Sequence, residues 1–247
     1  MDSIFEKQHT VTPDYCDMRF ALSPLAVFTI FQAMAAQHAE MLGVGGDAMA
    51  RLGEFWLTVH TRVDFFAPAH LMDELTACTW AEACGPKSIR CYRSCTLDRG
   101  DSRIASGKTE WTILGPEKKL VPFGSSNFPK DYDFPPRSAI DARPRRFRDT
   151  FEDADLHSHY TVRATDIDFG RHMNNVAYVR ALLDTFTARE IASGAIRSFE
   201  IHYCSPCLEG ETLSVFRKKT DKGFALGIRK PDGKTAVLAA VTLDDPV

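Results

Sequence analysis

The chain contains an internal repeat, and this repeat constrains the fold more than any single motif does. The stretch DMRFALSPLAVFTIFQAM, which begins at Asp17, aligns with DFGRHMNNVAYVRALLDT, which begins at Asp168, 151 positions later. A second pair of stretches, residues 63–75 and 201–213, aligns 138 positions apart. Two copies of one unit in a chain of 247 residues indicate two similar halves rather than one undivided domain.

Each half reads as a short strand, a turn, one long helix and a run of strands. The first helix is expected from Pro24 to about Leu42, because Ser23 is a natural N-cap and proline suits the first helical position. The second helix is expected from Asn175 to about Ser193. Alternating apolar residues and glycine-containing turns predict antiparallel strands after each helix. The predicted fold class is α+β, with a helix beside a curved antiparallel sheet in each half.

These patterns predict three segments: residues 1–114 and residues 158–247 as the two repeated units, and residues 115–157 as the connection between them. The connection contains six prolines and little periodicity, which is typical of an ordered linker. It also holds the basic run RPRRFR, from Arg143 to Arg148. This run either steers an acidic partner toward the protein or is a solvated linker face.

Composition excludes several classes of function. The net charge of −3 does not favour nucleic acid or an anionic membrane as a partner, and no apolar run has the roughly 18 residues that a membrane span needs. The N-terminal stretch lacks the order of an export signal, so a cytoplasmic location with reduced thiols is expected. The C-x-x-C of Cys204 and Cys207 has no second cysteine pair, and we disfavour metal or redox chemistry there.

The densest group of reactive side chains is DIDFGRHMNN, residues 166–175, directly before the second expected helix. This motif, together with a helix and a sheet in each half, resembles the acyl-ACP thioesterases, which carry two hot-dog units in one chain. The resemblance covers nearly the whole chain. It implies a double hot-dog fold and hydrolysis of the thioester between a fatty acyl chain and acyl carrier protein, in fatty acid biosynthesis. It implies neither a metal nor an organic cofactor.

The resemblance assigns the catalytic positions to Asp168, His172, Asn174 and Cys207. Asp168 is either a base that activates water or a direct nucleophile. His172 is suited to orienting water or donating a proton. Asn174 caps the helix, binds water, or does both. Cys207 is either a nucleophile or a buried thiol.

Two positions depart from the family's motif. Gly170 stands where the plant enzymes have asparagine, and Pro206 stands where the family has a glutamate before its cysteine. The nearest acid to Pro206 is Glu209. Without a side chain, Gly170 would let the backbone come close to the substrate at the start of the helix.

The first half has kept the scaffold and Asp17 but not the rest of the reactive set, since Ala21 aligns with His172 and Ser23 aligns with Asn174. One active site per chain is therefore expected, with the first half supplying surface for the acyl chain. Ordinary core packing also explains the same apolar residues, and the sequence favours it. The expected substrate-binding residues are Gly170, Asn175 and Tyr178 near the reactive group, and Phe28 and Trp56 along the acyl chain.

Other functions fit the same pattern. One is an acyl-CoA thioesterase of the same fold, which would need no docking patch for a carrier protein. Another is a non-catalytic acyl-binding protein, which the departures at Gly170 and Pro206 would favour. A dehydratase is disfavoured, because no second reactive histidine and acid appear in the first half. Either a monomer, in which the tandem forms a pseudo-dimer, or a homodimer is expected.

Overall fold

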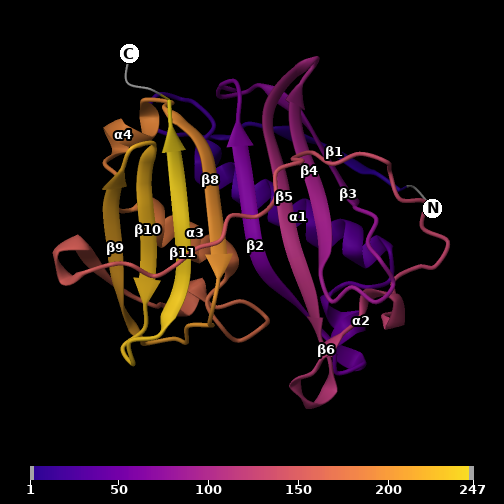
Figure 1. Cartoon of the computed structure of the whole chain (residues 1–247). Helices are drawn as coiled ribbons and strands as arrows, with labels where there is room; N and C mark the ends of the chain where they lie inside the picture. The colour runs from indigo at the N-terminus through magenta and orange to yellow at the C-terminus, as the bar shows by residue number, and fades with distance from the viewer. Residues whose placement is uncertain (1–2, 245–247) are drawn as a thin grey trace.

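A computed structural model describes residues 3–244 of the chain. The longest helix of each half packs behind one large antiparallel sheet, and a long connection crosses in front of it (Figure 1). The first half contains β1 (Phe5–Thr10), α1 (Pro24–Met41), α2 (Gly46–Arg51), β2 (Phe55–Phe65), β3 (Glu74–Ala81), β4 (Cys91–Arg99) and β5 (Ser102–Leu114). The second half contains β7 (Leu156–Thr161), α3 (Asn175–Leu183), α4 (Ala188–Ala192), β8 (Ile196–Tyr203), β9 (Thr212–Thr220), β10 (Gly223–Arg229) and β11 (Thr235–Leu243).

The strands of the described residues follow the order β1-β3-β4-β5-β2-β8-β11-β10-β9-β7. The two halves meet where β2 pairs with β8, with Thr61 opposite Ile201. Counted outward from this junction, the strands are β2-β5-β4-β3-β1 on one side and β8-β11-β10-β9-β7 on the other. Equivalent strands of the two halves therefore occupy equivalent places, and the halves are related by a pseudo-two-fold axis. Helices α1 and α3 contact each other behind the junction, and the main core between helices and sheet draws on both halves.

The repeat seen in the sequence extends to individual hydrogen bonds. The N–H of Asp17 donates to the carbonyl of Ala21, and the N–H of Asp168 donates to the carbonyl of His172. Isolated bridges join Cys16 to Leu22 and Ile167 to Met173, again 151 positions apart. The two halves thus build the same loop before the same helix. The division into residues 1–114, 115–157 and 158–247 stays a prediction.

The first helix follows its prediction, with the Ser23 side chain accepting the N–H of Ala26. The second prediction was too long. Helix α3 ends at Leu183, and a separate helix α4 begins at Ala188. The cause is a capping box: the Thr187 hydroxyl accepts the N–H of Glu190, and the Glu190 carboxylate accepts the N–H of Thr187. A new helix start inside the predicted helix interrupts it.

The connection between the halves is ordered and carries little regular structure. It holds β6 (Leu120–Val121), which pairs with β5, and short 3₁₀ turns at Pro116–Lys118, Phe123–Ser125 and Asp153–Asp155. Further 3₁₀ turns stand at Pro13–Tyr15 and Ala164–Asp166. Within residues 3–244, no helix combines the length and apolar character that crossing a bilayer requires.

Candidate active site

The reactive residues lie in a tight loop at the start of α3. The loop is closed by the bridge from Ile167 to Met173, and the N–H of Arg171 donates to the carbonyl of Asp168 at 2.9 Å. Arg171 has a φ of 61°, and Phe20, its counterpart in the first half, has a φ of 60°. The loop therefore belongs to the scaffold that both halves share, and only its side chains differ.

Asp166 fixes this loop to the helix. Its carboxylate is buried and accepts from the Tyr160 hydroxyl at 2.8 Å and the Arg163 N–H at 2.9 Å. It also pairs with the Arg180 guanidinium of α3. A carboxylate held by this many donors inside the protein is an anchor rather than a reactive group.

Asp168 is oriented by two donors. The backbone N–H of Gly170 donates to its Oδ1 at 2.8 Å, and the Asn174 side chain donates to its Oδ2 at 3.1 Å. Asn174 in turn accepts the N–H of Val176 at 2.8 Å as the N-cap of α3. Its oxygen also accepts from the Gln32 amide of α1 at 3.2 Å. Asn174 thus caps the helix and aims the Asp168 carboxylate at the same time.

His172 faces the same small space. Its Nδ1 lies 3.1 Å from the carbonyl of Met173, so an Nδ1 proton donated there leaves Nε2 as an acceptor. A Cβ built on Gly170 would lie 3.0 Å from His172 Nε2 and 3.0 Å from Asp168 Oδ1. The two atoms are therefore at most about 6 Å apart. The gap over Gly170 is open because glycine has no side chain.

Cys207 and Tyr178 lie beneath this loop rather than in it. Cys207 is 0% exposed, its N–H donates to the Tyr178 hydroxyl at 2.8 Å, and its carbonyl accepts the N–H of Met173. Burial raises the pKa of the Cys207 thiol, which disfavours the thiolate that a nucleophile requires. Burial also raises the pKa of Tyr178. Through these hydrogen bonds, the two residues hold the connection between β8 and β9 against the reactive loop.

The residues around Cys207 supply no second carboxylate to the reactive loop. Pro206 is exposed, and its carbonyl accepts from Lys230 at 2.7 Å. Glu209 is exposed at the surface. Glu211 accepts the N–H of Leu208 at 2.9 Å and pairs with Lys230. Asp168 is therefore the carboxylate best placed to act as a base in this loop.

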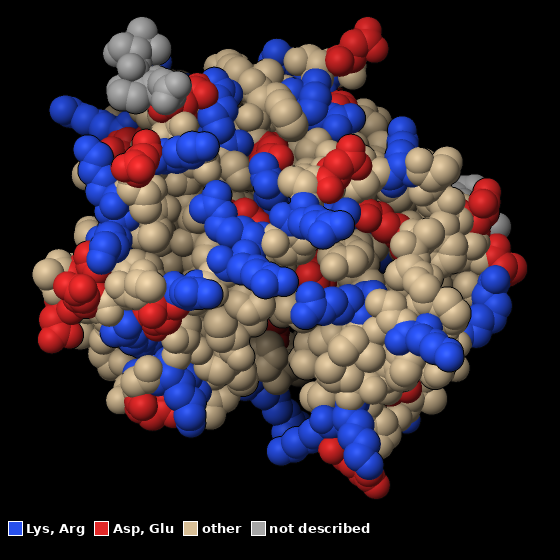
Figure 2. Space-filling model, in the orientation of Figure 1, with Lys and Arg blue, Asp and Glu red and all other residues tan. Residues whose placement is uncertain are grey.

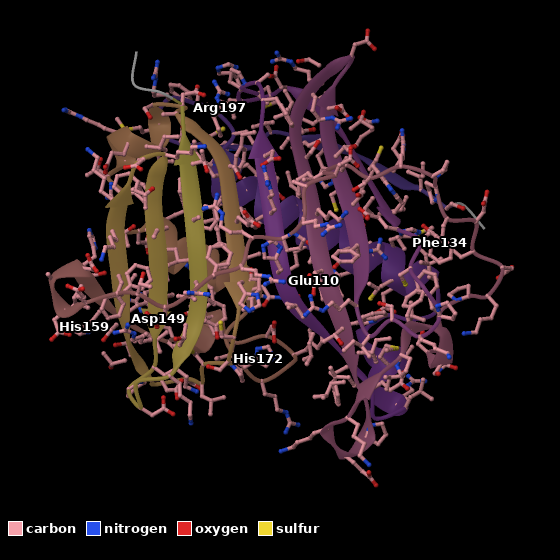
Figure 3. All side chains as sticks on the ribbon, in the orientation of Figure 1. Glu110, Phe134, Asp149, His159, His172 and Arg197 are labelled. Atoms are coloured by element: carbon pink, nitrogen blue, oxygen red, sulfur yellow. The ribbon has the colours of Figure 1, made fainter. Side chains whose placement is uncertain are left out.

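A pocket leads from the loop into the first half. It contains about 420 Å³ of empty space, including its open mouth. Asn175 lines it, and its side chain donates to the Thr58 hydroxyl of β2 at 2.8 Å. Figure 3 places His172 at the lower edge of the sheet between the halves, where the surface in Figure 2 is hollowed.

The pocket includes only part of the predicted acyl-binding set. Phe28 and Asn175 line it, whereas Tyr178 is buried and does not line it. Trp56 packs edge-on against Trp111, and its indole N–H donates to the carbonyl of Val44. Trp111, not Trp56, faces the pocket. Lining residues that the sequence did not single out are Gln32, Thr58, Thr61, Arg93, Thr109 and Tyr203.

For two of these pocket residues, the spacing in the sequence indicates the face on which they lie. Gln32 is one helical turn beyond Phe28, and Arg93 stands between Cys91 and Cys95 in strand alternation.

The two cysteines of the C-x-x-C motif, Cys204 and Cys207, are free thiols, the first exposed and the second buried. Across residues 3–244, no three His, Cys, Asp or Glu side chains are grouped to hold a metal ion.

Comparison with known sequences gives the family. The profile described as acyl-ACP thioesterase N-terminal domain matches residues 2–122, and the profile described as acyl-ACP thioesterase C-terminal domain matches residues 150–243. This chain belongs to the acyl-ACP thioesterase family. It is 20% identical over 232 residues to the chloroplastic oleoyl-acyl carrier protein thioesterase of Coriandrum sativum. The match covers 87% of this chain and 62% of that protein.

Solved structures of acyl-ACP thioesterases share the fold. An acyl-ACP thioesterase from Bacteroides thetaiotaomicron superposes with a TM-score of 0.86 at 20% identity, covering 98% of each chain. The 12:0-ACP thioesterase of Umbellularia californica gives a TM-score of 0.82 at 17% identity, covering 99% of this chain and 98% of that chain. The predicted α+β double hot-dog fold is confirmed.

Proposed function

We propose that the protein hydrolyses the thioester between a fatty acyl chain and acyl carrier protein, releasing the free fatty acid and the carrier in fatty acid biosynthesis. The observation that carries this proposal is that Asp168 and His172 face each other over Gly170, in the loop that leads into α3. The first residues of α3, Asn175 and Val176, line a pocket formed by both halves. Family membership supports the same activity. In this proposal, residues 1–114 supply most of the acyl surface and residues 158–247 supply the reactive groups.

The proposed reaction uses a water molecule held between Asp168 and His172. Asp168 takes a proton from the water, and the hydroxide adds to the thioester carbonyl carbon. The backbone N–H of Asn175 and the positive end of the α3 dipole stabilise the oxygen that becomes negative. The carbonyl then re-forms as the C–S bond breaks, and the proton passes from Asp168 through His172 to the departing thiolate.

Three further residues have supporting roles in this reaction. Asn174 keeps the Asp168 carboxylate aimed at the water, and Gly170 leaves space for it. Asn175 lines the pocket, and its side chain donates a hydrogen bond to Thr58 of the other half. Cys207 is assigned a structural role, because its thiol is fully buried in the core.

We further propose a carrier protein, rather than coenzyme A, as the natural acyl donor. Lys and Arg side chains form a band across the face where the connection crosses the sheet (Figures 1 and 2). Arg143, Arg145, Arg146 and Arg148 of the connection are all exposed. An acidic carrier would be drawn to this band. A cytoplasmic location and a monomeric or homodimeric state stay predictions of the sequence.

The test is turnover of acyl-ACP and acyl-CoA esters that carry the same chain. We expect a higher kcat/KM for acyl-ACP, falling with added salt, since exposed charges are screened. The double variant Arg146→Glu with Arg148→Glu should lower kcat/KM for acyl-ACP about 10-fold or more and leave acyl-CoA nearly unchanged. Equal rates on both esters would favour an acyl-CoA thioesterase. Tight acyl binding without turnover on either would favour an acyl-binding protein.

A further inference from the structure

The pocket is more polar at its inner end than an alkyl chain requires. Starting at Asn175, it runs along α1 past Gln32 and reaches Thr109 and Arg93 on β5 and β4. Pockets for plain hydrocarbon are lined mainly by apolar side chains, because an alkyl end offers no partner to a polar group. A guanidinium at the inner end is the least expected of these residues.

Arg93 is buried and aimed at this pocket. Its side chain lines the cavity, and the residue is 9% exposed. Its Nη1 lies 2.8 Å from His38 Nδ1 and donates to the Thr79 hydroxyl at 3.3 Å. Arginine can only donate, so His38 accepts at Nδ1 and is neutral. Both partners of the guanidinium are therefore uncharged.

No Asp or Glu among the described residues 3–244 forms an ion pair with Arg93. Burial lowers the pKa of Arg93, yet arginine keeps its charge in proteins. A guanidinium also has five N–H donors in a planar fork, and its contacts with His38 and Thr79 are both made by Nη1. A buried cation without a counter-charge is costly, and a carboxylate that accepts from the fork would neutralise it.

The position of Arg93 suits the far end of a bound chain. Thr109 of β5 pairs with Thr61 of β2 on one side and with Arg93 of β4 on the other. Three strand spacings, roughly 14 Å, separate β8 beside the reactive loop from β4. Carbon–carbon bonds of about 1.5 Å advance an extended chain by roughly 1.3 Å each, so about ten carbons cover this distance.

We propose that Arg93 binds a carboxylate at the far end of the acyl chain, so that the preferred substrates are ω-carboxyacyl thioesters on the order of ten carbons long. This inference rests on the proposed hydrolase function. The thioester end lies at Asp168 and His172, and the charged end lies against the Arg93 guanidinium. Thr109, beside Arg93 in the lining, offers its hydroxyl to the same carboxylate.

The test compares decanoyl-ACP, which ends in a methyl group, with the decanedioyl monothioester of ACP, which ends in a carboxylate. We expect the wild type to favour the carboxylate-ended ester at least 10-fold in kcat/KM. Arg93→Met should reverse this preference, and Arg93→Lys should keep part of it. Arg62→Met, a matched arginine change on the opposite face of the sheet, should leave the preference unchanged.

Two results would overturn the proposal: a wild type that prefers decanoyl-ACP, or a folded Arg93→Met variant that loses both activities equally. The wild-type preference decides the matter even if Arg93→Met fails to fold. If neither ester is hydrolysed, the proposed function fails. Thermal shift with free decanedioate and free decanoate then tests whether Arg93 binds a carboxylate in the pocket. Decanedioate should then stabilise the wild type but not Arg93→Met, and equal stabilisation of both would contradict the role of Arg93.

Discussion

At the scale of single residues, Gly170 sets the geometry of the candidate site. A methyl group on Gly170 would lie 3.0 Å from both Asp168 Oδ1 and His172 Nε2, in the space assigned to water. We expect Gly170→Ala to lower kcat at least 10-fold and to shift Tm little. Gly85→Ala is the matched control, because a Cβ there meets nothing within 4 Å. Steady-state kinetics and thermal unfolding check both variants, and an active Gly170→Ala would place the water elsewhere.

The sequence indicated the reactive residues because they share one short motif, and it missed their partners because those are distant. Gln32 contacts Asn174 from 142 positions away, and Thr58 contacts Asn175 from 117 positions away. No local pattern marks such pairs. The resemblance also suggested Cys207, whose complete burial only the structure reveals.

At the scale of elements, helix α1 and strand β5 control the width of the pocket. A Cβ on Gly107 of β5 would lie 2.6 Å from Cδ2 and Cε2 of Phe31, which lines the pocket. We expect Gly107→Ala to push this ring into the pocket, to cost about 1–3 kcal/mol of stability, and to favour shorter acyl chains. Denaturant unfolding and a chain-length series measure the two effects. An unchanged chain-length profile would show that Phe31 moves away from the acyl path.

Element boundaries were predictable where caps are explicit in the sequence. Ser23 and Pro24 begin α1 as expected. The break after α3 was also predictable, since Thr187 and Glu190 have the spacing of a capping box. The apolar stripe nevertheless continues past this point in the sequence, which made the predicted helix too long. Trp56 was predicted to lie along the acyl chain, whereas β2 carries it outside the pocket, where it donates to the carbonyl of Val44.

At the scale of the whole molecule, Asp149 fastens the connection to the second half. It lies on the sheet face in Figure 3, and its carboxylate accepts two hydrogen bonds from Arg229 and one from the Thr235 hydroxyl. The Arg229 hydrogen bonds, above all, lower the pKa of Asp149 from 3.8 to about 2. Since the folded pKa is depressed, the stabilisation is present above the unfolded pKa and is lost as pH falls through the folded value.

We therefore expect Asp149→Asn to lower the free energy of unfolding by about 2 kcal/mol at pH 7. The difference from the wild type should shrink between about pH 4 and pH 2. Asp141→Asn, at an exposed aspartate of the same connection, is the control and should change little. Urea unfolding at several pH values measures this, and a difference that does not depend on pH would rule out the Arg229 pair as its cause.

The two-fold repeat offers the most direct test of the central claim, which is that one reactive loop per chain acts through Asp168. Asp17 occupies the matching loop and accepts the N–H groups of Arg19 and Ala21. We predict that Asp168→Asn lowers kcat on acyl-ACP by about 10²-fold or more, as for loss of a general base. Asp17→Asn should keep kcat within about 2-fold, because that loop has no histidine or paired asparagine. Equal losses in both variants, or full activity in Asp168→Asn, would contradict the account.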